Sequence, residues 1–304
     1  MRDPFMYTIS CDGMSIFRQK QTIFGGNRYM DIKELKKTAA DVRIGVIKAL
    51  HNAGSGHPGG SLSISDIVTA LYFNEMNIDP KDPAKKGRDK CVFSKGHAGP
   101  AQLSAMGIAG YYDMDDFTEN LRKIGSKFQG HPNMKIPGIE MSTGSLGQGF
   151  SVAAGMAMAN KLDKDPGRVY AVLGDGELQE GLVWEAAMSA SHYGLDNLVA
   201  IVDHNGLQID GRNDDVMKVN PIGAKFEGFG WNVLAIDGHD MQQILDAFAK
   251  ARECKGKPTV IVAETVKGKG VSFMEDQAGW HGKAPNEEQT QQALEELEAA
   301  KAAL

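Results

Sequence analysis

Apolar residues along the chain fall into two kinds of run, and each kind predicts a different element. Continuous runs of strand length, rich in β-branched residues, occur at 168–173, 197–203, 231–236 and 258–263, with a shorter one at 89–94. Runs without polar alternation are typical of strands that are buried on both faces. These segments therefore predict the strands of a central sheet.

The second kind of run repeats apolar residues at helical spacing. The longest begins after Asp31, a candidate N-cap, and ends at Gly54, a candidate stop. Asn286 and Gln289 form a candidate capping box that opens a surface helix near the end of the sequence. The other predicted helices lie at 63–76, 97–108, 113–121, 147–161, 178–193 and 240–252. Helices that separate buried strands predict an α/β fold, with a doubly wound, mostly parallel sheet and helices on both faces.

Residues 1–29 differ from the rest of the chain because they show no clear period and include the loose run FGGNR. We predict that they form an N-terminal extension, either disordered or not native, since Met30 is a candidate start of translation. Residues 30–304 then form one domain. The first residues lack the continuous apolar stretch of a secretory signal.

Composition and charge exclude several classes of protein. Of the 304 residues, 42% are hydrophobic and 24% are charged, a balance typical of globular proteins. The net charge of −6 offers no basic surface to nucleic acid or to an anionic membrane. There is no run of about 18 apolar residues to span a bilayer. The three cysteines lack metal-ligand spacing and fit reduced thiols, so a cytoplasmic location is expected.

Two polar side chains follow neighbouring strands of the predicted sheet. Asp175 lies between two glycines after the strand at 168–173, and Asn205 follows the strand at 197–203, 30 positions further along. The carboxyl ends of parallel strands joined by a helix meet at one edge of a sheet. The two side chains, with a backbone carbonyl just beyond, therefore predict an Mg²⁺ site completed by phosphate oxygens and water. Read alone, Gly-Asp-Gly and Asn-Gly would each be only a turn.

A glycine-rich run, GSLGQG at 144–149, opens the helix predicted at 147–161. Its backbone amides can approach a phosphate, and the N-terminal dipole of the helix favours an anion there. The run lacks the Lys-Ser/Thr pair of a Walker loop, so nucleoside triphosphate binding is not expected. Taken alone, it fits close packing of small residues equally well.

Four histidines that stand beside glycine in predicted loops are His57, His97, His131 and His281. A single loop histidine is usually a polar surface residue, but four in such loops indicate a cluster. Their spacing is not that of zinc ligands, and no cysteine accompanies them.

Together these segments resemble the transketolase family. A Gly-Asp-Gly followed after this interval by Asn is similar to the signature of thiamine diphosphate enzymes. The stretches similar to transketolase are SGHPGG (55–60), SKGHAGPAQLSAM (94–106), GHP (130–132), TGSLGQGFSVAAGMAMA (143–159), GDGELQEG (174–181) and HNGLQIDG (204–211). The resemblance runs from about residue 38 to about 285, in the family's order. It covers only the N-terminal, diphosphate-binding half of a full-length transketolase.

The resemblance implies the thiamine diphosphate-binding fold, with thiamine diphosphate and Mg²⁺ as cofactors. Asp175, Asn205 and the carbonyl of Leu207 would bind the metal, and Asn205 thereby contacts the cofactor too. His204 stands where the family more often has Asp or Asn, but this position is not a family ligand. The residues that would supply backbone around the cofactor are Gly144, Leu146 and Gly176.

The same resemblance assigns roles to the histidines and to one acid. His97 and His281 would contact the cofactor diphosphate. His57, His131 and His281 would line the substrate channel, hydrogen-bond the sugar hydroxyls and shuttle protons. Glu180 matches the family Glu at the subunit contact near the cofactor, although the helix dipole also favours an exposed acid in a first helical turn.

Transketolases transfer a two-carbon ketol unit from a ketose phosphate to an aldose phosphate, and the resemblance implies this reaction of the pentose phosphate pathway. In the family, activation of the cofactor needs a Glu against its aminopyrimidine, and that Glu belongs to the other half. The chain is therefore expected to be inactive alone. It would work with a separate C-terminal, pyrimidine-binding subunit, as an α2β2 assembly.

Three alternatives stay open. A split transketolase could act on a different sugar, sulfonated or branched, because the residues that read the far end of the substrate lie largely on the partner. A non-catalytic, cofactor-binding regulator is a second class, but it need not keep the channel histidines. An α-ketoacid dehydrogenase α-subunit carries the same Gly-Asp-Gly and Asn, whereas SKGHAGPAQ and WHGKAP favour transketolase.

Overall fold

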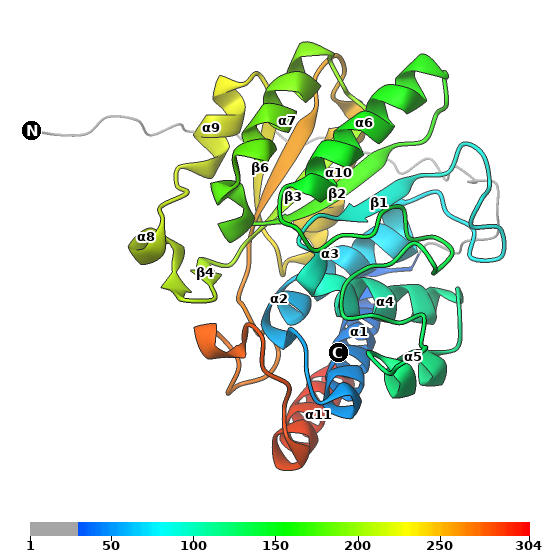
Figure 1. Cartoon of the computed structure of the whole chain (residues 1–304), viewed down its shortest axis with the longest axis vertical. Coiled ribbons are helices and arrows are strands. Elements are labelled where there is room, and N and C mark those ends of the chain that lie inside the picture. Colours follow the sequence, from blue (N-terminus) through cyan, green and yellow to red (C-terminus); the bar gives the residue numbers. More distant parts are fainter. Residues whose placement is uncertain (1–29) are drawn as a thin grey trace, which may run out of the picture.

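Five parallel strands form the central sheet, in the order β1-β2-β3-β7-β6 (Figure 1). The computed structural model describes residues 30–304, so the extension predicted at 1–29 lies outside the described residues. The strands of the sheet are β1 (Lys90–Phe93), β2 (Val169–Gly174), β3 (Leu198–His204), β6 (Asn232–Asp237) and β7 (Thr259–Glu264). A short antiparallel ribbon joins β4 (Leu207–Gln208) to β5 (Gly211–Arg212).

Helices connect the strands and cover the sheet. The α-helices are α1 (Ile32–Ala53), α2 (Pro58–Ser63), α3 (Ser65–Ala70), α4 (Gly99–Ala109), α5 (Met114–Asn120), α6 (Gln148–Leu162), α7 (Gly181–His192), α8 (Asn213–Val216), α9 (Ile222–Gly228), α10 (Met241–Glu253) and α11 (Glu287–Ala302). A π-helical turn (Leu71–Glu75) continues α3, and 3₁₀ turns lie at Gly96–Ala98, Gly176–Gln179 and Ala278–Trp280.

Alternate residues of the strands enter two different cores, one on each face of the sheet. On β2, Tyr170 and Val172 pack in the core that contains residues of α1, α3 and α4, while Ala171 and Leu173 pack in the core that contains residues of α6 and α7. Both sides of the strand are therefore buried, which explains its continuous apolar run. The predicted fold class, a doubly wound parallel α/β sheet with helices on both faces, is confirmed.

The predicted caps of the first and last helices are confirmed. The Asp31 carboxylate accepts the amide of Glu34 at 2.8 Å, and the Glu34 side chain accepts the amide of Asp31 at 3.0 Å. Gly54, at φ +62°, ends α1 in the left-handed conformation that glycine adopts without strain. Asn286 and Gln289 form the corresponding box at α11.

The sequence-based prediction was wrong in three details. The strand at 231–236, predicted to be buried on both faces, is β6 at one edge of the sheet, where it pairs only with β7, and its residues are partly or fully exposed. The helix predicted at 178–193 is interrupted at Glu180, whose extended backbone (φ −75°, ψ 127°) separates a 3₁₀ turn from α7. Helices α2, α8 and α9 were not predicted.

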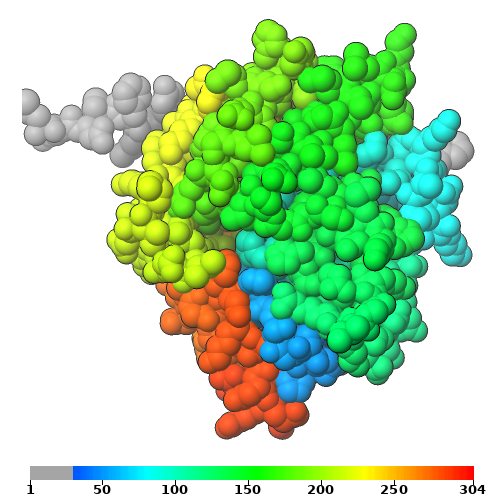
Figure 2. Space-filling view, viewed as in Figure 1, coloured from blue at the N-terminus to red at the C-terminus, as the bar shows by residue number. Residues whose placement is uncertain are grey.

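The carboxyl ends of β1, β2, β3 and β7 lead into the segments that carry His97, Asp175, Asn205 and His281, respectively. Figure 2 shows segments from the first, middle and last parts of the described chain, in blue, green and orange, meeting on one face of the molecule. Within residues 30–304, no helix combines the length and the apolar character needed to cross a membrane.

Candidate active site

The four predicted histidines lie together. His57 precedes α2, His97 lies in the turn after β1, His131 lies in the loop after α5, and His281 follows the turn at 278–280. The ring centroid of His57 is 5.6 Å from those of His97 and His131 and 5.5 Å from that of His281. The rings of His97 and His281 are 4.9 Å apart. The loops thus bring four imidazoles from distant parts of the sequence into one cluster around His57.

Burial and neighbouring cations keep these imidazoles neutral. Burial, followed by the charges of His131, Arg122 and Lys267, lowers the pKa of His57 to about 4. Burial, followed by Lys267, lowers the pKa of His281 to about 3. The pKa of His97 falls well below its ordinary value, and that of His131 is also lowered, in both cases chiefly by burial. Neutral rings can both donate and accept a hydrogen bond, as contacts with hydroxyl groups require.

Lys267 fixes the tautomer of His281. Its ammonium lies 3.0 Å from Nδ1 of His281 and can only donate, so Nδ1 accepts and the ring proton sits on Nε2. Burial lowers the pKa of Lys267 to about 8, which leaves it mostly protonated at neutral pH. His281 therefore offers an N–H from Nε2 to a ligand.

The three residues predicted to bind the metal converge at the ends of β2 and β3. The Asp175 carboxylate is buried and accepts the amide of Gly206, between Asn205 and Leu207, at 2.6 Å. Oδ1 of Asn205 accepts the amide of Leu207 at 3.1 Å, and the Leu207 carbonyl accepts from Lys267 at 3.2 Å. A carboxylate, an amide oxygen and a carbonyl are thus gathered next to a buried cation.

The glycine-rich loop packs tightly against the turn that carries His97. A Cβ added to Gly96 would lie 2.8 Å from the amide nitrogen of Gly144, so the two loops approach more closely than a side chain allows. Gly147, at φ +80°, precedes α6, and its amide donates to the buried carboxylate of Glu177 at 2.8 Å. Glu177 also accepts the amide of Gly174 at 3.0 Å and the hydroxyl of Ser94. This carboxylate therefore joins the loops after β1 and β2 to the start of α6.

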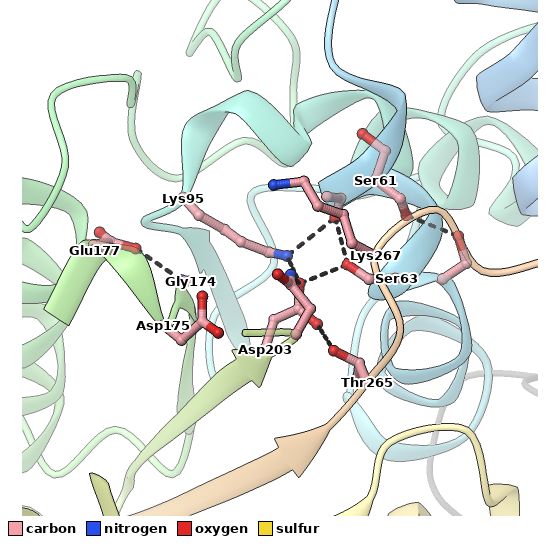
Figure 3. A network of polar contacts seen from close by, with 12 residues as sticks. Ser61, Ser63, Lys95, Gly174, Asp175, Glu177, Asp203, Thr265 and Lys267 are labelled. Carbon is pink, nitrogen blue, oxygen red and sulfur yellow. Dashed lines mark hydrogen bonds and ion pairs between the residues drawn. The ribbon is translucent and has the colours of Figure 1, made fainter. Parts of the chain in front are cut away.

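Sequence analysis missed a second buried network, centred on Asp203 at the end of β3 (Figure 3). Its Oδ2 accepts from the ammonium of Lys95 and from Ser63, the latter at 2.6 Å. Its Oδ1 accepts from Thr265 at 2.5 Å. The available signals were the position of Lys95 beside His97 and that of Asp203 two residues before Asn205. However, a charged residue within a polar motif is expected to be exposed to solvent, and only the folded structure shows that Lys95 and Asp203 are buried.

The remaining predicted residues lie around this centre. Gly144 is next to His131, because a Cβ on Gly144 would lie 3.3 Å from Cδ2 of that ring. Leu146 and Gly176 are half buried, and Gly176 lies beside Gln208. Glu180 is exposed at the start of α7, where its side chain makes no capping hydrogen bond. His204 pairs with Glu264 at 2.7 Å and not with the three metal-binding candidates.

The residues present fit thiamine diphosphate with Mg²⁺. The Nδ1 atom of His57 and the hydroxyl of Thr143 are buried and have no hydrogen-bond partner among residues 30–304, which is typical of a site whose ligand supplies the partner. The candidate metal ligands are all oxygens, as a hard cation prefers. Within the described chain, no three His, Cys, Asp or Glu side chains form a metal-binding group. A site with one carboxylate leaves room for diphosphate oxygens.

Comparison with known proteins identifies the family. Residues 35–301 match the family model described as transketolase, thiamine diphosphate binding domain. The chain belongs to the transketolase family and corresponds to its N-terminal, thiamine diphosphate-binding part. The family predicted from the sequence is therefore confirmed.

Two relatives are single subunits of similar length. The chain is 42% identical over 266 residues to the 6-deoxy-6-sulfo-D-fructose transketolase subunit SqwG of Clostridium sp. (strain MSTE9), which covers 87% of this chain and 96% of the relative. It is 40% identical over 268 residues to one subunit of the apulose-4-phosphate transketolase of Phocaeicola vulgatus, which covers 88% and 95%. Transketolase of Homo sapiens is 42% identical over 270 residues, but this covers only 42% of the human protein.

Solved transketolases share the fold. Transketolase from Campylobacter jejuni superposes with a TM-score of 0.83 at 33% identity, covering 90% of this chain and 46% of that one. The Pichia stipitis enzyme in complex with sedoheptulose 7-phosphate gives a TM-score of 0.80 at 31% identity, covering 88% and 43%. The chain thus spans less than half the length of these solved enzymes.

Proposed function

We propose that the chain is the diphosphate-binding subunit of a split transketolase and that thiamine diphosphate and Mg²⁺ are its cofactors. The observation that carries this proposal is that Lys267 joins the four-histidine cluster to the metal-binding candidates. Its ammonium lies 3.0 Å from Nδ1 of His281 and 3.2 Å from the carbonyl of Leu207, at the carboxyl ends of parallel strands. Ligands of open α/β sheets bind at that edge. The reaction is the transfer of a two-carbon ketol unit from a ketose phosphate to an aldose phosphate.

In this proposal the residues of the chain hold the cofactor and handle the protons of the sugar. Asp175, Asn205 and the Leu207 carbonyl hold the metal, and the loop from Gly144 to Gly147 supplies amides around the diphosphate. When bound, thiamine diphosphate supplies a carbon nucleophile and stabilises the negative charge that develops on the two-carbon unit.

The neutral histidines are proposed to contact the sugar substrate. His57, His131 and His281 orient the sugar hydroxyls and exchange protons with them, while His97 and His281 contact the diphosphate. His281 is suited to donate from Nε2 because Lys267 occupies its Nδ1. Glu180, exposed beside the glycine-rich loop, is available for the subunit contact that we predict for it.

The chain is proposed to act only with a separate C-terminal subunit, as an α2β2 assembly in the cytoplasm. The names of the Clostridium and Phocaeicola relatives, each called a transketolase subunit, support a divided enzyme. Those names also support a second candidate, a split transketolase for a sulfonated or branched sugar. The chain is 42% and 40% identical to these two relatives, and it is also 42% identical to Homo sapiens transketolase. Sequence identity therefore does not decide which sugar is the substrate.

The test is turnover by the purified chain, alone and with a transketolase C-terminal subunit added as the proposed partner. Xylulose 5-phosphate, 6-deoxy-6-sulfofructose and apulose 4-phosphate are compared as ketol donors to one aldose phosphate, with thiamine diphosphate and Mg²⁺. The proposal is supported if the chain shows no turnover by itself and turns over a donor when the partner is present. The preferred donor then decides between a transketolase for ordinary ketose phosphates and one for a sulfonated or branched sugar. Turnover by the chain alone would contradict the need for a partner. Cofactor binding without turnover of any donor would favour the regulator.

A further inference from the structure

Two carboxylates and two ammonium groups are buried together at the ends of β1, β2, β3 and β7. The exposed fractions are 2% for Asp175, 0% for Asp203, 1% for Lys95 and 2% for Lys267. Buried charges are costly unless they are paired, and here two positive charges balance two negative ones. The site is therefore neutral before any divalent cation or diphosphate arrives.

The ammonium of Lys95 forms an ion pair with Asp203. Figure 3 shows the Lys95 side chain extended toward the end of β3, where the ammonium pairs with Oδ2 of Asp203 and donates to the carbonyl of Gly60 at 3.0 Å. Ser63 and Thr265 donate to the same carboxylate. The Asp203 carboxylate thus accepts from protein donors in the turn after β1, in α2 and in the segment after β7.

Asp203 in turn sets the orientation of the Asn205 amide. The NH₂ group of Asn205 donates to Oδ2 of Asp203 at 3.0 Å. An ionised carboxylate can only accept, so this contact requires the nitrogen of the amide to face Asp203 and its oxygen to face away. The oxygen lies on the side of the Leu207 amide, 3.1 Å from it. The orientation of Asn205 therefore depends on Asp203 being ionised and held in place.

We propose that Lys95 is a positioning residue that withholds Asp203 from the divalent cation and, through Asp203, aims the Asn205 oxygen, so that the cation binds tightly only together with a diphosphate. This inference rests on the proposed cofactor site. With Asp203 paired to Lys95, the cation meets the Asp175 carboxylate, one amide oxygen and one carbonyl. Asp175 accepts the amides of Gly176 and Gly206 but has no ammonium partner among residues 30–304. Mg²⁺ held by so few protein groups completes its coordination with phosphate oxygens and water. Removal of Lys95 would leave the negative charge of Asp203 without its ammonium partner and so raise the affinity for the cation alone.

The test measures Mn²⁺ binding by electron paramagnetic resonance, with and without inorganic diphosphate. The natural protein is expected to bind Mn²⁺ at least about 10-fold more tightly with diphosphate. Lys95→Met, and Lys95→Gln, which keeps a donor for Gly60, are expected to bind Mn²⁺ alone at least about 10-fold more tightly than the natural protein. The double variant K95M/D203N should lose that gain. Lys90→Met is the matched control, because Lys90 lies on β1, just before the turn that carries Lys95, and its ammonium contacts Asn160 instead of Asp203.

The proposal predicts that the Lys95 variants bind Mn²⁺ more tightly, whereas damage to the fold would weaken binding. The direction of the change therefore separates the two explanations. Folded Lys95 variants that bind Mn²⁺ alone no more tightly than the natural protein would overturn the proposal. Equal binding by the natural protein with and without diphosphate would do the same. If neither Lys95 variant folds, Asp203→Asn decides, since it should weaken Mn²⁺–diphosphate binding by about 10- to 100-fold, and an unchanged affinity counts against us.

The failure of this inference is distinguishable from that of the proposed function. None of these measurements uses sugar turnover. If the natural protein binds no Mn²⁺ even with thiamine diphosphate, the proposed cofactor site itself is wrong. If the natural protein binds Mn²⁺ together with thiamine diphosphate, but the Lys95 variants have the same affinity for Mn²⁺ alone as Lys90→Met, only the role of Lys95 is wrong.

Discussion

The imidazole rings of His97 and His281 lie 4.9 Å apart, although one follows the first strand of the sheet and the other follows the last. Because β1 and β7 run parallel to each other in one sheet, the loops at their carboxyl ends open on the same edge. The contact therefore depends on the whole sheet and forms only when the chain is folded. Lys267, which donates to His281, comes from the segment that links β7 to this histidine.

Acid should destabilise the protein through His57. Below about pH 6.5 the unfolded chain takes up a proton on this residue, whereas the folded protein, in which burial lowers the pKa to about 4, does not. Stability is therefore lost as the pH falls from about 6.5 to about 4. His57→Leu removes this loss and also the unpartnered Nδ1, so its melting temperature should fall less than that of the natural protein between about pH 7 and about pH 5.

The control for this prediction is His192→Leu, which removes an exposed imidazole at the end of α7. Its melting temperature should follow the natural protein at both pH values. If His57→Leu loses as much stability in acid as the control, proton uptake at His57 is not a cause. Turnover with the partner subunit should drop in His57→Leu, because the same neutral ring is proposed to contact the sugar.

Asp175→Ala is expected to weaken Mg²⁺-dependent binding of thiamine diphosphate by about 100-fold or more, because it removes the one carboxylate among the three proposed metal-binding groups. Isothermal titration calorimetry with the cofactor, in the presence and absence of Mg²⁺, measures this without any substrate. Asp210→Ala is the matched control, because Asp210 is an exposed acid in the turn between β4 and β5. Unchanged cofactor affinity in Asp175→Ala would remove this residue from the metal site.

The strands and the loops that follow them could be predicted from the sequence because the signals are local. A continuous apolar run such as VYAVL predicts a buried strand, and the Gly-Asp-Gly directly after it predicts a ligand at the strand end. The position of Asp175 beside Asn205 then follows from the rule for parallel strands. The order of strands in the sheet decides the rest, and it is not a local property.

The errors have the same origin. The run at 231–236 resembles that at 258–263, yet only the sheet order makes the first an edge strand and the second a central one. From the sequence alone, Lys95 is expected at the surface, because a lysine is rarely buried without a charged partner. Its partner Asp203 is 108 positions away in the sequence. Such pairs become visible only when the fold brings their segments together.

The domain boundary can be tested by a chain that begins at Met30. Asp31 and Glu34 would keep the capping box of α1, and Met30 itself packs against the core and accepts a weak hydrogen bond from Thr38. The melting temperature and the affinity for thiamine diphosphate are therefore expected to equal those of the full chain. A clear drop in either would show that residues 1–29 contribute to the domain, contrary to the prediction.

Glu177→Gln tests whether one buried carboxylate holds the glycine-rich loop in place. The natural side chain accepts hydrogen bonds from the amides of Gly147 and Gly174 and from Ser94, and burial raises its pKa. Glutamine has the same shape but presents an NH₂ group to one of these donors, which then lacks an acceptor. An unsatisfied buried donor costs about 1–3 kcal/mol, so the free energy of unfolding should fall by about that amount.

Cofactor binding separates this role from general stability. Gly147 starts α6 and Gly144 lies in the same loop, so loosening the contact should also weaken the affinity for thiamine diphosphate measured well below the melting temperature. Glu185→Gln, at an exposed acid on α7, provides the control and should change neither quantity. If Glu177→Gln lowers stability but leaves cofactor affinity intact, the carboxylate supports the fold without shaping the loop. A loss of both would mean that the loop reaches its binding conformation only while Ser94 and the two amides share one acceptor.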